Sequence, residues 1–338
     1  MSTTISRASK RLRVVAPPPS SGWVCNSCRR SFATTQRLGE RVQQERARLE
    51  EQQRIEDKTT HFGFETVAES LKASRVANVF SSVASSYDTM NDLMSLGIHR
   101  IWKDGFVRGL NPGIRPTPSS SSAGPQRILD IAGGTGDIAL RMLDHATAIN
   151  KDTTAHVTVS DINPEMLAEG RKRLSATPYA AAGRVDFLEA NAEDLHTIPD
   201  ASIDLYTVAF GIRNFTHKEK ALREAHRVLK PGGVFACLEF APNLSNPLFN
   251  AVYKRWSFSA IPLIGQIVAS DRDSYQYLVE SIERFPKQEV FASMIRDAGF
   301  VVPGVGREGG RGEVESLEGG WEDLSFGIAA VHKGVKPV

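Results

Sequence analysis

The sequence predicts an α/β protein in which helices cover both faces of a mostly parallel sheet. Two patterns carry this prediction. An apolar strand at 128–132 runs directly into a glycine-rich turn and then into helical spacing. Strand-like and helix-like segments then alternate along the chain. With 338 residues, 41% of them hydrophobic, the chain can bury one large core and still carry a tail.

The glycine-rich turn contains Gly133, Gly134 and Gly136, and a helix begins near Ile138. Glycine suits this turn because the chain must bend sharply and a ligand can approach the bare backbone. Free amide groups at the start of the helix offer donors to a polar ligand. The segment therefore predicts a nucleotide-type crevice at the carboxyl end of the strand. The spacing Gly134-x-Gly136-x-x-Ala139 alone fits NAD, S-adenosylmethionine (SAM) or a structural glycine turn.

Two further predicted strands end in polar residues beside the same crevice. The strand at 155–160 ends at Asp161, whose carboxylate can accept both hydroxyl groups of a ribose or serve as an acid at a helix N-terminus. Pro164 fits the first turn of the helix that follows. The strand at 184–188 leads into the polar turn 191–194, which can bind an adenine edge or be an ordinary turn.

The alternation continues to the end of the chain. The remaining predicted elements are a strand at 203–210, a helix at 219–229, a strand at 234–239, a helix at 291–298 and a final strand at 325–331. A segment rich in glycine, glutamate and arginine, 304–320, is predicted to be a mobile excursion before the last strand.

Helical, amphipathic spacing also covers 72–105, ahead of the first strand, so these helices are expected to cap the crevice and line a substrate pocket. The Pro/Ser-rich segment 112–125 is predicted to be a surface loop. The apolar and aromatic segment 247–284 has three interpretations: core packing, a lipophilic substrate channel or a membrane-facing patch.

The first 39 residues contain no Asp or Glu but several Arg and Lys residues and many Ser and Thr residues. This composition predicts a mitochondrial transit peptide over 1–39, with cleavage near 32/33; a disordered basic tail is the alternative. Residues 40–58 are strongly charged and are predicted to be a solvated linker.

Charge and cysteine content narrow the possible partners. The formal net charge is +2 and no basic stripe stands out, so we expect no nucleic-acid partner. No apolar run reaches the ~18 residues that a membrane span needs. Cys25 and Cys28 have the spacing of half a zinc site, but no second pair of ligands follows at usable spacing. We therefore predict no metal.

Longer blocks are more specific than the glycine loop. They are Thr60-His-Phe-Gly-Phe64; Tyr87-Asp-Thr-Met-Asn91 with Ser95, His99 and Trp102; Asp130-Ile-Ala-Gly-Gly-Thr-Gly136; Asp161-Ile-Asn163; Phe210-Gly-Ile-Arg-Asn214; Arg227-Val-Leu-Lys-Pro-Gly-Gly233; Leu238-Glu-Phe240; Ser274-Tyr-Gln-Tyr-Leu278; and Arg284-Phe-Pro286. On these blocks, residues 59–334 resemble the ubiquinone/menaquinone biosynthesis C-methyltransferase family. The glycine loop and the Lys-Pro-Gly-Gly turn mark only the wider SAM-dependent methyltransferase superfamily.

The resemblance implies a Rossmann-like class I SAM-dependent methyltransferase fold. Its sheet would be seven-stranded and mostly parallel with the last strand antiparallel, with helices on both faces and an N-terminal helical cap. The domain would span 59–334, with insert loops at 112–125 and 304–320. The resemblance places SAM against the glycine loop (Gly133, Gly134, Thr135 and Gly136), Asp161 and the turn formed by Asn191 and Ala192.

The resemblance also implies a function. The chain would methylate a ring carbon of 2-methoxy-6-polyprenyl-1,4-benzoquinol in ubiquinone biosynthesis, with SAM as co-substrate. It would work in the mitochondrial matrix, peripheral to the inner membrane, in a complex with other ubiquinone-biosynthesis enzymes and with a homodimer as one possibility. Two other hypotheses remain: a non-catalytic SAM-fold scaffold subunit of that complex, and an NAD-dependent oxidoreductase.

A quinol ring carbon becomes more nucleophilic when its neighbouring hydroxyl ionises, and for a phenol-like pKa of ~10 this costs roughly 3–4 kcal/mol near pH 7.5. In the family that the chain resembles, the arginine matching Arg213 acts through a water as general base, with Asn214 and Tyr87 in support. Because an arginine pKa exceeds ~12, we interpret Arg213 as a cation that stabilises a quinolate or hydroxide; a surface ion pair is the alternative. Asp88 and His99 are other candidate proton acceptors.

Overall fold

The computed structural model describes residues 58–83, 91–92, 95, 97–114, 124–242, 247–269, 272–303 and 320–338. The chain divides into a unit Met1–Asp57 and a unit Lys58–Val338, and all described residues belong to the second. The predicted transit peptide, Cys25 and Cys28, nearly all of the linker and most of both insert loops lie outside the described residues, as do Tyr87 and Asp88.

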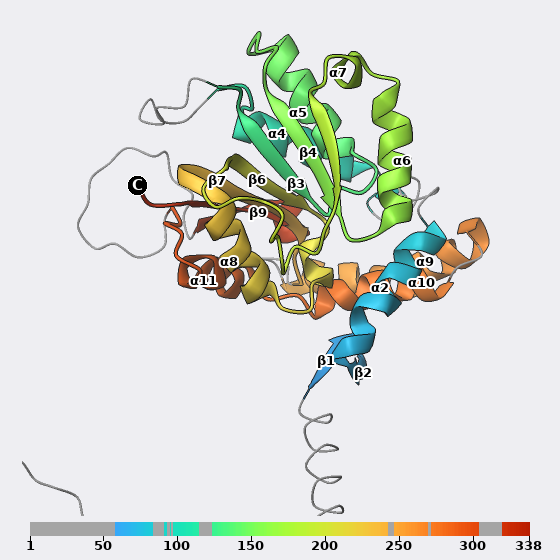
Figure 1. Ribbon diagram of the computed structural model, residues 1–338. Coiled ribbons are helices and arrows are strands. Elements are labelled where there is room, and N and C mark those ends of the chain that lie inside the picture. Colours follow the sequence, from blue (N-terminus) through green and yellow to red (C-terminus); the bar gives the residue numbers. More distant parts are fainter. Residues whose placement is uncertain are drawn as a thin grey trace, which may run out of the picture. The chain divides into compact units, whose positions relative to one another are not determined.

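The core of the described unit is a seven-stranded sheet with strand order β5-β4-β3-β6-β7-β9-β8 (Figure 1). The strands are β3 (Arg127–Ile131), β4 (His156–Asp161), β5 (Val185–Glu189), β6 (Ile203–Ala209), β7 (Leu229–Phe240), β8 (Trp321–Leu324) and β9 (Ala329–Val335). The strands β3 to β7 pair in parallel, and β9 runs antiparallel to both β7 and β8. The expected mostly parallel sheet with a reversed last strand is confirmed.

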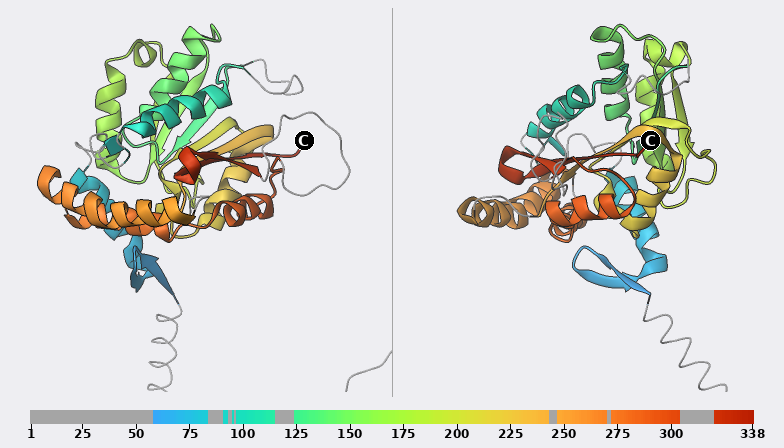
Figure 2. Two further views of the ribbon diagram at one scale, coloured as in Figure 1. Left: turned by 180° about the vertical axis from the view of Figure 1, so that it is seen from behind. Right: turned by 90° about the vertical axis from the view of Figure 1, so that its left-hand side faces the viewer.

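Helices cover both faces of the sheet (Figure 2). The helices around it are α4 (Ile98–Leu110), α5 (Asp137–Ala148), α6 (Pro164–Ser175), α7 (Pro178–Ala181), α8 (Lys218–Val228), α10 (Arg272–Glu283) and α11 (Gln288–Asp297). Along β3, Ile128 packs into a cluster with α4, α5, α6 and α10, whereas Leu129 packs into a cluster with α8 and α11. Successive strand residues point to opposite faces, so a strand that is apolar throughout requires cover on both sides.

Within the described residues, the expected helical cap includes α2 (Glu69–Val83) and α4. A hairpin that the sequence analysis missed precedes them, formed by β1 (Thr59–Phe62) paired antiparallel with β2 (Glu65–Ala68). Gly63 turns the hairpin with φ +58°. Phe62 stacks on Tyr277 of α10 with ring centroids 4.2 Å apart. The hairpin therefore depends on a distant helix, which short-range patterns do not reveal.

The carboxyl-terminal strands differ from the prediction in register. Residues 325–327 form a short 3₁₀ turn, with φ +49° at Ser325 and +63° at Phe326. The strand predicted at 325–331 is β9, which begins only at Ala329, and β8 was missed. The apolar run that predicted the strand spans the reversal between β8 and β9, so hydrophobicity alone misplaces the boundary.

The apolar segment 247–284 forms α9 (Pro247–Ala269) and α10. Core packing is confirmed for α10, where Tyr275, Tyr277 and Leu278 are buried. In contrast, α9 exposes Trp256, Phe258 and Leu263, of which Leu263 is 59% exposed. Among the helices in the described part of the chain, none has both the length and the apolar character that a bilayer crossing requires.

Candidate active site

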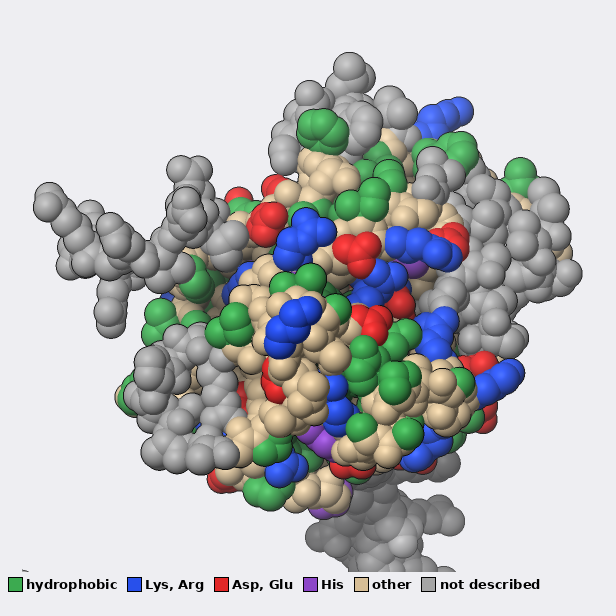
Figure 3. All heavy atoms as spheres, turned by 90° about the horizontal axis from the view of Figure 1, so that it is seen from above, with side chains coloured by type: hydrophobic (Ala, Val, Ile, Leu, Met, Phe, Trp, Pro, Cys, Tyr) green, Lys and Arg blue, Asp and Glu red, His purple; other side chains and the backbone are tan. Residues whose placement is uncertain are grey.

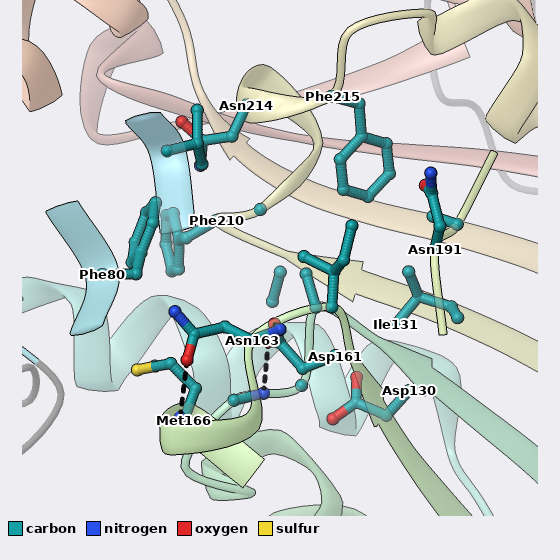
Figure 4. A pocket seen from close by; sticks show the side chains of 18 of the residues that line it. Phe80, Asp130, Ile131, Asp161, Asn163, Met166, Asn191, Phe210, Asn214 and Phe215 are labelled. Atoms are coloured by element: carbon teal, nitrogen blue, oxygen red, sulfur yellow. Dashed lines mark hydrogen bonds between the residues drawn. The ribbon is translucent and has the colours of Figure 1, made fainter. Parts of the chain in front are cut away.

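A pocket lies at the carboxyl ends of the four adjacent strands β5, β4, β3 and β6 (Figure 4). Its walls are residues at and just after the ends of these strands, together with Lys103 of α4 and four residues of α2: Ala73, Val76, Ala77 and Phe80. The pocket lining includes most of the predicted cofactor residues: Gly133, Gly134, Thr135, Asp161, Asn191 and Ala192. The predicted crevice is therefore present, and α2 forms part of its cap.

The glycine loop is held by backbone contacts. The Gly133 amide donates to the Ser160 carbonyl (3.0 Å), and the Gly136 amide donates to the Gly133 carbonyl (2.8 Å). Gly136 is not among the pocket-lining residues; it precedes α5 with φ +74°, and a Cβ there would lie 2.6 Å from the Leu174 side chain. Its role in this geometry is to let the chain enter α5 against α6.

Gly170 of α6 packs directly on this loop, because a Cβ at Gly170 would lie 2.5 Å from the Gly134 carbonyl oxygen. We expect Gly170→Ala to destabilise the fold by about 2–3 kcal/mol, since the backbone of the loop must move. Gly105 is a matched control within α4, where an added Cβ meets nothing within 4 Å. Gly105→Ala is expected to stabilise the fold by about 0.5–1 kcal/mol. Urea unfolding of both variants checks the difference, and equal effects would contradict it.

Asp161 connects the glycine loop to the second strand. One carboxylate oxygen accepts from the Gly134 amide (3.1 Å) and the other from the Asn163 amide (2.9 Å). Burial raises the pKa of Asp161 to about 6, although the backbone hydrogen bonds oppose that shift. The amides of Gly134, Ile162 and Asn163 use only part of the carboxylate's acceptor capacity, so the carboxylate can still accept hydroxyl groups.

Asn163 is a site residue without an assigned role in the sequence analysis, and it connects the cap to the pocket. Its side-chain oxygen caps α6 by accepting from the amides of Glu165 (3.0 Å) and Met166 (3.1 Å). Its amide nitrogen donates to the Ala77 carbonyl and the Ser81 hydroxyl of α2, each at 3.0 Å. One asparagine therefore holds the end of β4 against the cap.

Asp130 is a buried acid in the pocket lining for which the sequence analysis assigned no role. Its Oδ1 accepts from the Thr207 hydroxyl at 2.8 Å. Its Oδ2 has no hydrogen-bond partner among the described residues. Burial raises the pKa of Asp130 to about 7. A buried acceptor without a partner is costly, so this oxygen favours a ligand that donates a hydrogen bond.

The turn after β5 is tied to the loop after β6. The Asn191 side-chain oxygen accepts from the Glu193 amide (2.9 Å), which shapes the turn. The Glu193 carboxylate then accepts from the amides of Thr216 (2.8 Å) and His217 (2.9 Å). These contacts hold the Asn191–Ala192 turn next to the 214–216 loop, and both segments line the same pocket.

Arg213 is fully buried and lies behind the pocket wall rather than in its lining. Its guanidinium donates to the carboxylate of Glu239 (2.9 Å), to the Phe210 carbonyl and to the Ser281 hydroxyl (3.3 Å). The side chains of Arg213 and Glu239 are each 1% exposed. The alternative of a surface ion pair is therefore wrong, because the pair is buried and the positive charge is already balanced.

Asn214, the next residue, does line the pocket. The Tyr277 hydroxyl donates to its side-chain oxygen at 3.0 Å, which fixes the amide orientation. Both Glu239 and Tyr277 lie in quoted sequence blocks, but nothing local indicated that they would meet Arg213 and Asn214.

His99, the alternative proton acceptor, is not in the pocket lining. It is buried, with Nε2 2.8 Å from Asp92. Burial lowers the pKa of His99.

In the described part of the chain, no three or more His, Cys, Asp or Glu side chains gather as a possible metal site. On the face of the protein shown in Figure 3, Lys and Arg side chains are interspersed with Asp and Glu and form no continuous block.

Comparisons with known proteins agree with this site. Residues 68–336 match the model of the ubiE/COQ5 methyltransferase family. The chain is 56% identical over 277 residues to the mitochondrial 2-methoxy-6-polyprenyl-1,4-benzoquinol methylase of Schizosaccharomyces pombe, covering 82% of this chain and 84% of that protein. It is 47% identical over 287 residues to the mitochondrial protein of the same name from Oryza sativa subsp. japonica, covering 82% and 88%.

A bacterial relative, the ubiquinone/menaquinone biosynthesis C-methyltransferase of Paracoccus denitrificans, is 50% identical over 281 residues, covering 83% of this chain and 98% of that protein. A solved SAM-dependent methyltransferase from Thermotoga maritima is 19% identical with a TM-score of 0.46, covering 77% and 98%. The family decides between the ligands that fit the glycine motif, in favour of SAM over NAD. The chain therefore belongs to the ubiE/COQ5 methyltransferase family and is a SAM-dependent methyltransferase with a Rossmann-like class I fold.

Proposed function

We propose that the chain transfers the methyl group of SAM to a ring carbon of 2-methoxy-6-polyprenyl-1,4-benzoquinol in ubiquinone biosynthesis. The names of the two mitochondrial relatives support this substrate. The observation that carries the proposal is a single pocket that brings Asp161 and the Asn191–Ala192 turn together with Asn214. Groups suited to a nucleoside and a group suited to a ring hydroxyl therefore share one cavity.

In this proposal Asp161 accepts the ribose hydroxyls, the Asn191–Ala192 turn binds the adenine edge, and Thr135 and the glycine loop bind the amino-acid end of SAM. When bound, SAM supplies a methyl already activated on a sulfonium. The task left to the protein is to align the ring carbon with that methyl and to exclude water.

The predicted catalytic residues act as follows. Asn214 contacts a ring hydroxyl, and Tyr277 holds its amide in place. Arg213 holds the 210–214 turn through its hydrogen bond to the Phe210 carbonyl. Its positive charge favours ionisation of the quinol ring hydroxyl, although the negative charge of Glu239 offsets part of this effect. Tyr87, which lies outside the described residues, has a supporting role in the proposal. In this proposal, catalysis depends on the positioning of the substrate and on the fixed amide dipole of Asn214 more than on an unpaired cation.

We also propose a mitochondrial matrix location with peripheral contact to the inner membrane. The acid-free composition of residues 1–39 and the mitochondrial names of two relatives support the location. The exposed apolar side chains on α9, Trp256, Phe258 and Leu263, support contact with a membrane or a lipid tail.

A complex with other ubiquinone-biosynthesis enzymes and a homodimer belong to the same proposal. A purely scaffolding role predicts no requirement for SAM binding, which calorimetry measures directly.

The pathway step is tested by mass spectrometry of quinols in cells that lack the protein. We expect accumulation of the polyprenyl methoxybenzoquinol without its ring methyl, reversed by the wild-type chain but not by a variant that binds no SAM. If the variant that binds no SAM restored ubiquinone synthesis fully, the scaffold alternative would replace this proposal.

A further inference from the structure

The β1–β2 hairpin is a part of the described chain to which the proposed methyl transfer assigns no role. The family match begins at residue 68, so Phe62 at the hairpin turn lies ahead of it. Figure 1 shows the hairpin beside the start of α2, apart from the seven-stranded sheet. Its contacts with α10 nevertheless lead to the candidate active site.

The hairpin turn is held along one side of α10. Tyr277, Glu280 and Arg284 are three and four residues apart, which places them on the same face of a helix and its end. Phe62 stacks on the Tyr277 ring with centroids 4.2 Å apart and an interplanar angle of 19°. The Phe64 amide donates to the Glu280 carboxylate at 3.0 Å, and the Arg284 guanidinium lies 5.6 Å from the centre of the Phe64 ring. The hairpin is therefore fixed to α10 at successive turns.

Tyr277 connects this contact to the pocket. Its side chain is buried, and its hydroxyl donates to Oδ1 of Asn214 at 3.0 Å. Burial raises the pKa of the Tyr277 hydroxyl, which therefore stays protonated and remains a donor at neutral pH. Asn214 lines the pocket. Because Oδ1 accepts from Tyr277, the NH₂ group is the end of the amide that can donate to a substrate oxygen.

The stack restricts the orientation of the Tyr277 ring. Phe62 covers one face of that ring, and aromatic pairs are stabilised beyond the burial of their area. Rotation about the Cα–Cβ bond of Tyr277 would separate the two rings and carry the hydroxyl away from Asn214. A displacement of about 1 Å far from the reacting atoms can lower turnover about 100-fold. The orientation of Asn214 therefore depends on a contact made outside the pocket.

We propose that Phe62 is a positioning residue for methyl transfer: by stacking on Tyr277 it keeps the Tyr277 hydroxyl on Asn214, and so keeps the Asn214 amide directed at the substrate. The inference rests on the proposed role of Asn214. It gives the hairpin a function in turnover. Binding of SAM, which uses groups at the ends of other strands, does not depend on this contact.

The first test compares turnover of SAM and a short-chain methoxybenzoquinol by hairpin variants of the whole chain. Phe62→Leu keeps an apolar side chain but no ring, so kcat should fall about 3- to 10-fold, the range for one aromatic pair. The dissociation constant for SAM should stay within about 3-fold of wild type. Phe62→Tyr keeps the ring and should retain kcat. Phe64→Leu is the matched control, because Phe64 stacks on Phe258 instead, and it should also retain kcat.

A double-mutant cycle then separates positioning from a structural role. Tyr277→Phe removes the hydroxyl and should lower kcat about 10-fold, the effect of one hydrogen bond. In Phe62→Leu/Tyr277→Phe the loss should stay near 10-fold, because Phe62 acts through the hydroxyl that is already missing. Losses that multiply to about 30- to 100-fold would overturn the inference. An equal loss in Phe64→Leu would do the same, and so would full turnover in Tyr277→Phe, even if Phe62→Leu did not fold.

The side-chain amide of Asn214 provides a readout that requires no turnover. In protein labelled with ¹⁵N-asparagine, its NMR signal is assigned by its loss in Asn214→Asp. The signal should shift in Phe62→Leu and stay in place in Phe64→Leu; an unchanged signal in Phe62→Leu would overturn the inference. If wild type transferred no methyl to the quinol, the proposed function would fail, while this signal would still decide whether Phe62 positions Asn214.

Discussion

Arg213→Met is expected to abolish methyl transfer and to lower the free energy of unfolding by about 3–5 kcal/mol, because Glu239 would remain buried without its partner. For a domain of this size, this lowers the midpoint of thermal unfolding by about 10 °C. Replacing one member of an exposed pair provides the control. Arg75 pairs with Glu65 and the two side chains are 40% and 58% exposed, so Arg75→Met should cost less than about 1 kcal/mol.

The double variant Arg213→Met/Glu239→Gln separates stability from catalysis. Removing both charges should restore most of the lost stability, since no unpaired buried charge remains. Methyl transfer should stay absent, while the dissociation constant for SAM should stay within about 3-fold of wild type, because neither residue lines the pocket. Thermal unfolding, calorimetry and a turnover assay provide the three readouts. Full turnover in the stable double variant would remove Arg213 from the mechanism.

The second large effect is expected at Asp161. Asp161→Asn should weaken SAM binding about 100-fold, since weakening two charge-assisted hydrogen bonds by about 1.4 kcal/mol each costs about 2.8 kcal/mol. The amide would also present a donor to the Gly134 amide, which now donates to the carboxylate. The exposed acid Asp194 is a suitable control, and Asp194→Asn should bind SAM normally. Calorimetry measures both, and equal affinities would show that Asp161 does not hold the ribose.

The affinity for SAM is also expected to depend on pH because of Asp161. Burial raises the pKa of Asp161 to about 6, so the carboxylate becomes protonated as the pH falls through that value. SAM affinity should therefore be higher at pH 7.5 than at pH 5.5. Asp130, with a pKa raised to about 7, titrates in the same range, so Asp161→Asn should lose only the step near pH 6. An unchanged pH profile in Asp161→Asn would contradict the assignment of that step.

The sequence was sufficient for features set by short segments. The strand at β3, the glycine loop and the position of Asp161 follow from local hydrophobicity and from turns that only glycine forms without strain. These features place the nucleoside half of the pocket. The parallel order of the strands then brings Asn191 and Asn214 to the same edge.

Features that depend on distant contacts were not predictable in the same way. Lys103 reaches the pocket from the cap and meets Asp137 on α5. Glu239, on a different strand, neutralises Arg213, which the sequence alone presented as an unpaired cation. Likewise, the β1–β2 hairpin depends on the stacking of Phe62 with Tyr277. In each case the pairing is set by tertiary packing, which leaves no local periodic signal.

The central claim is that this pocket transfers a methyl group from SAM to a quinol ring carbon. The most direct measurement is to incubate the purified chain with SAM carrying a ¹³C-labelled methyl and a short-chain demethylated methoxybenzoquinol, and to record carbon NMR of the product. The account predicts one new signal at the chemical shift of a methyl bonded to an aromatic carbon, absent with Asp161→Asn at low SAM. A label found only on oxygen, or no transfer by protein that binds both ligands, would contradict it.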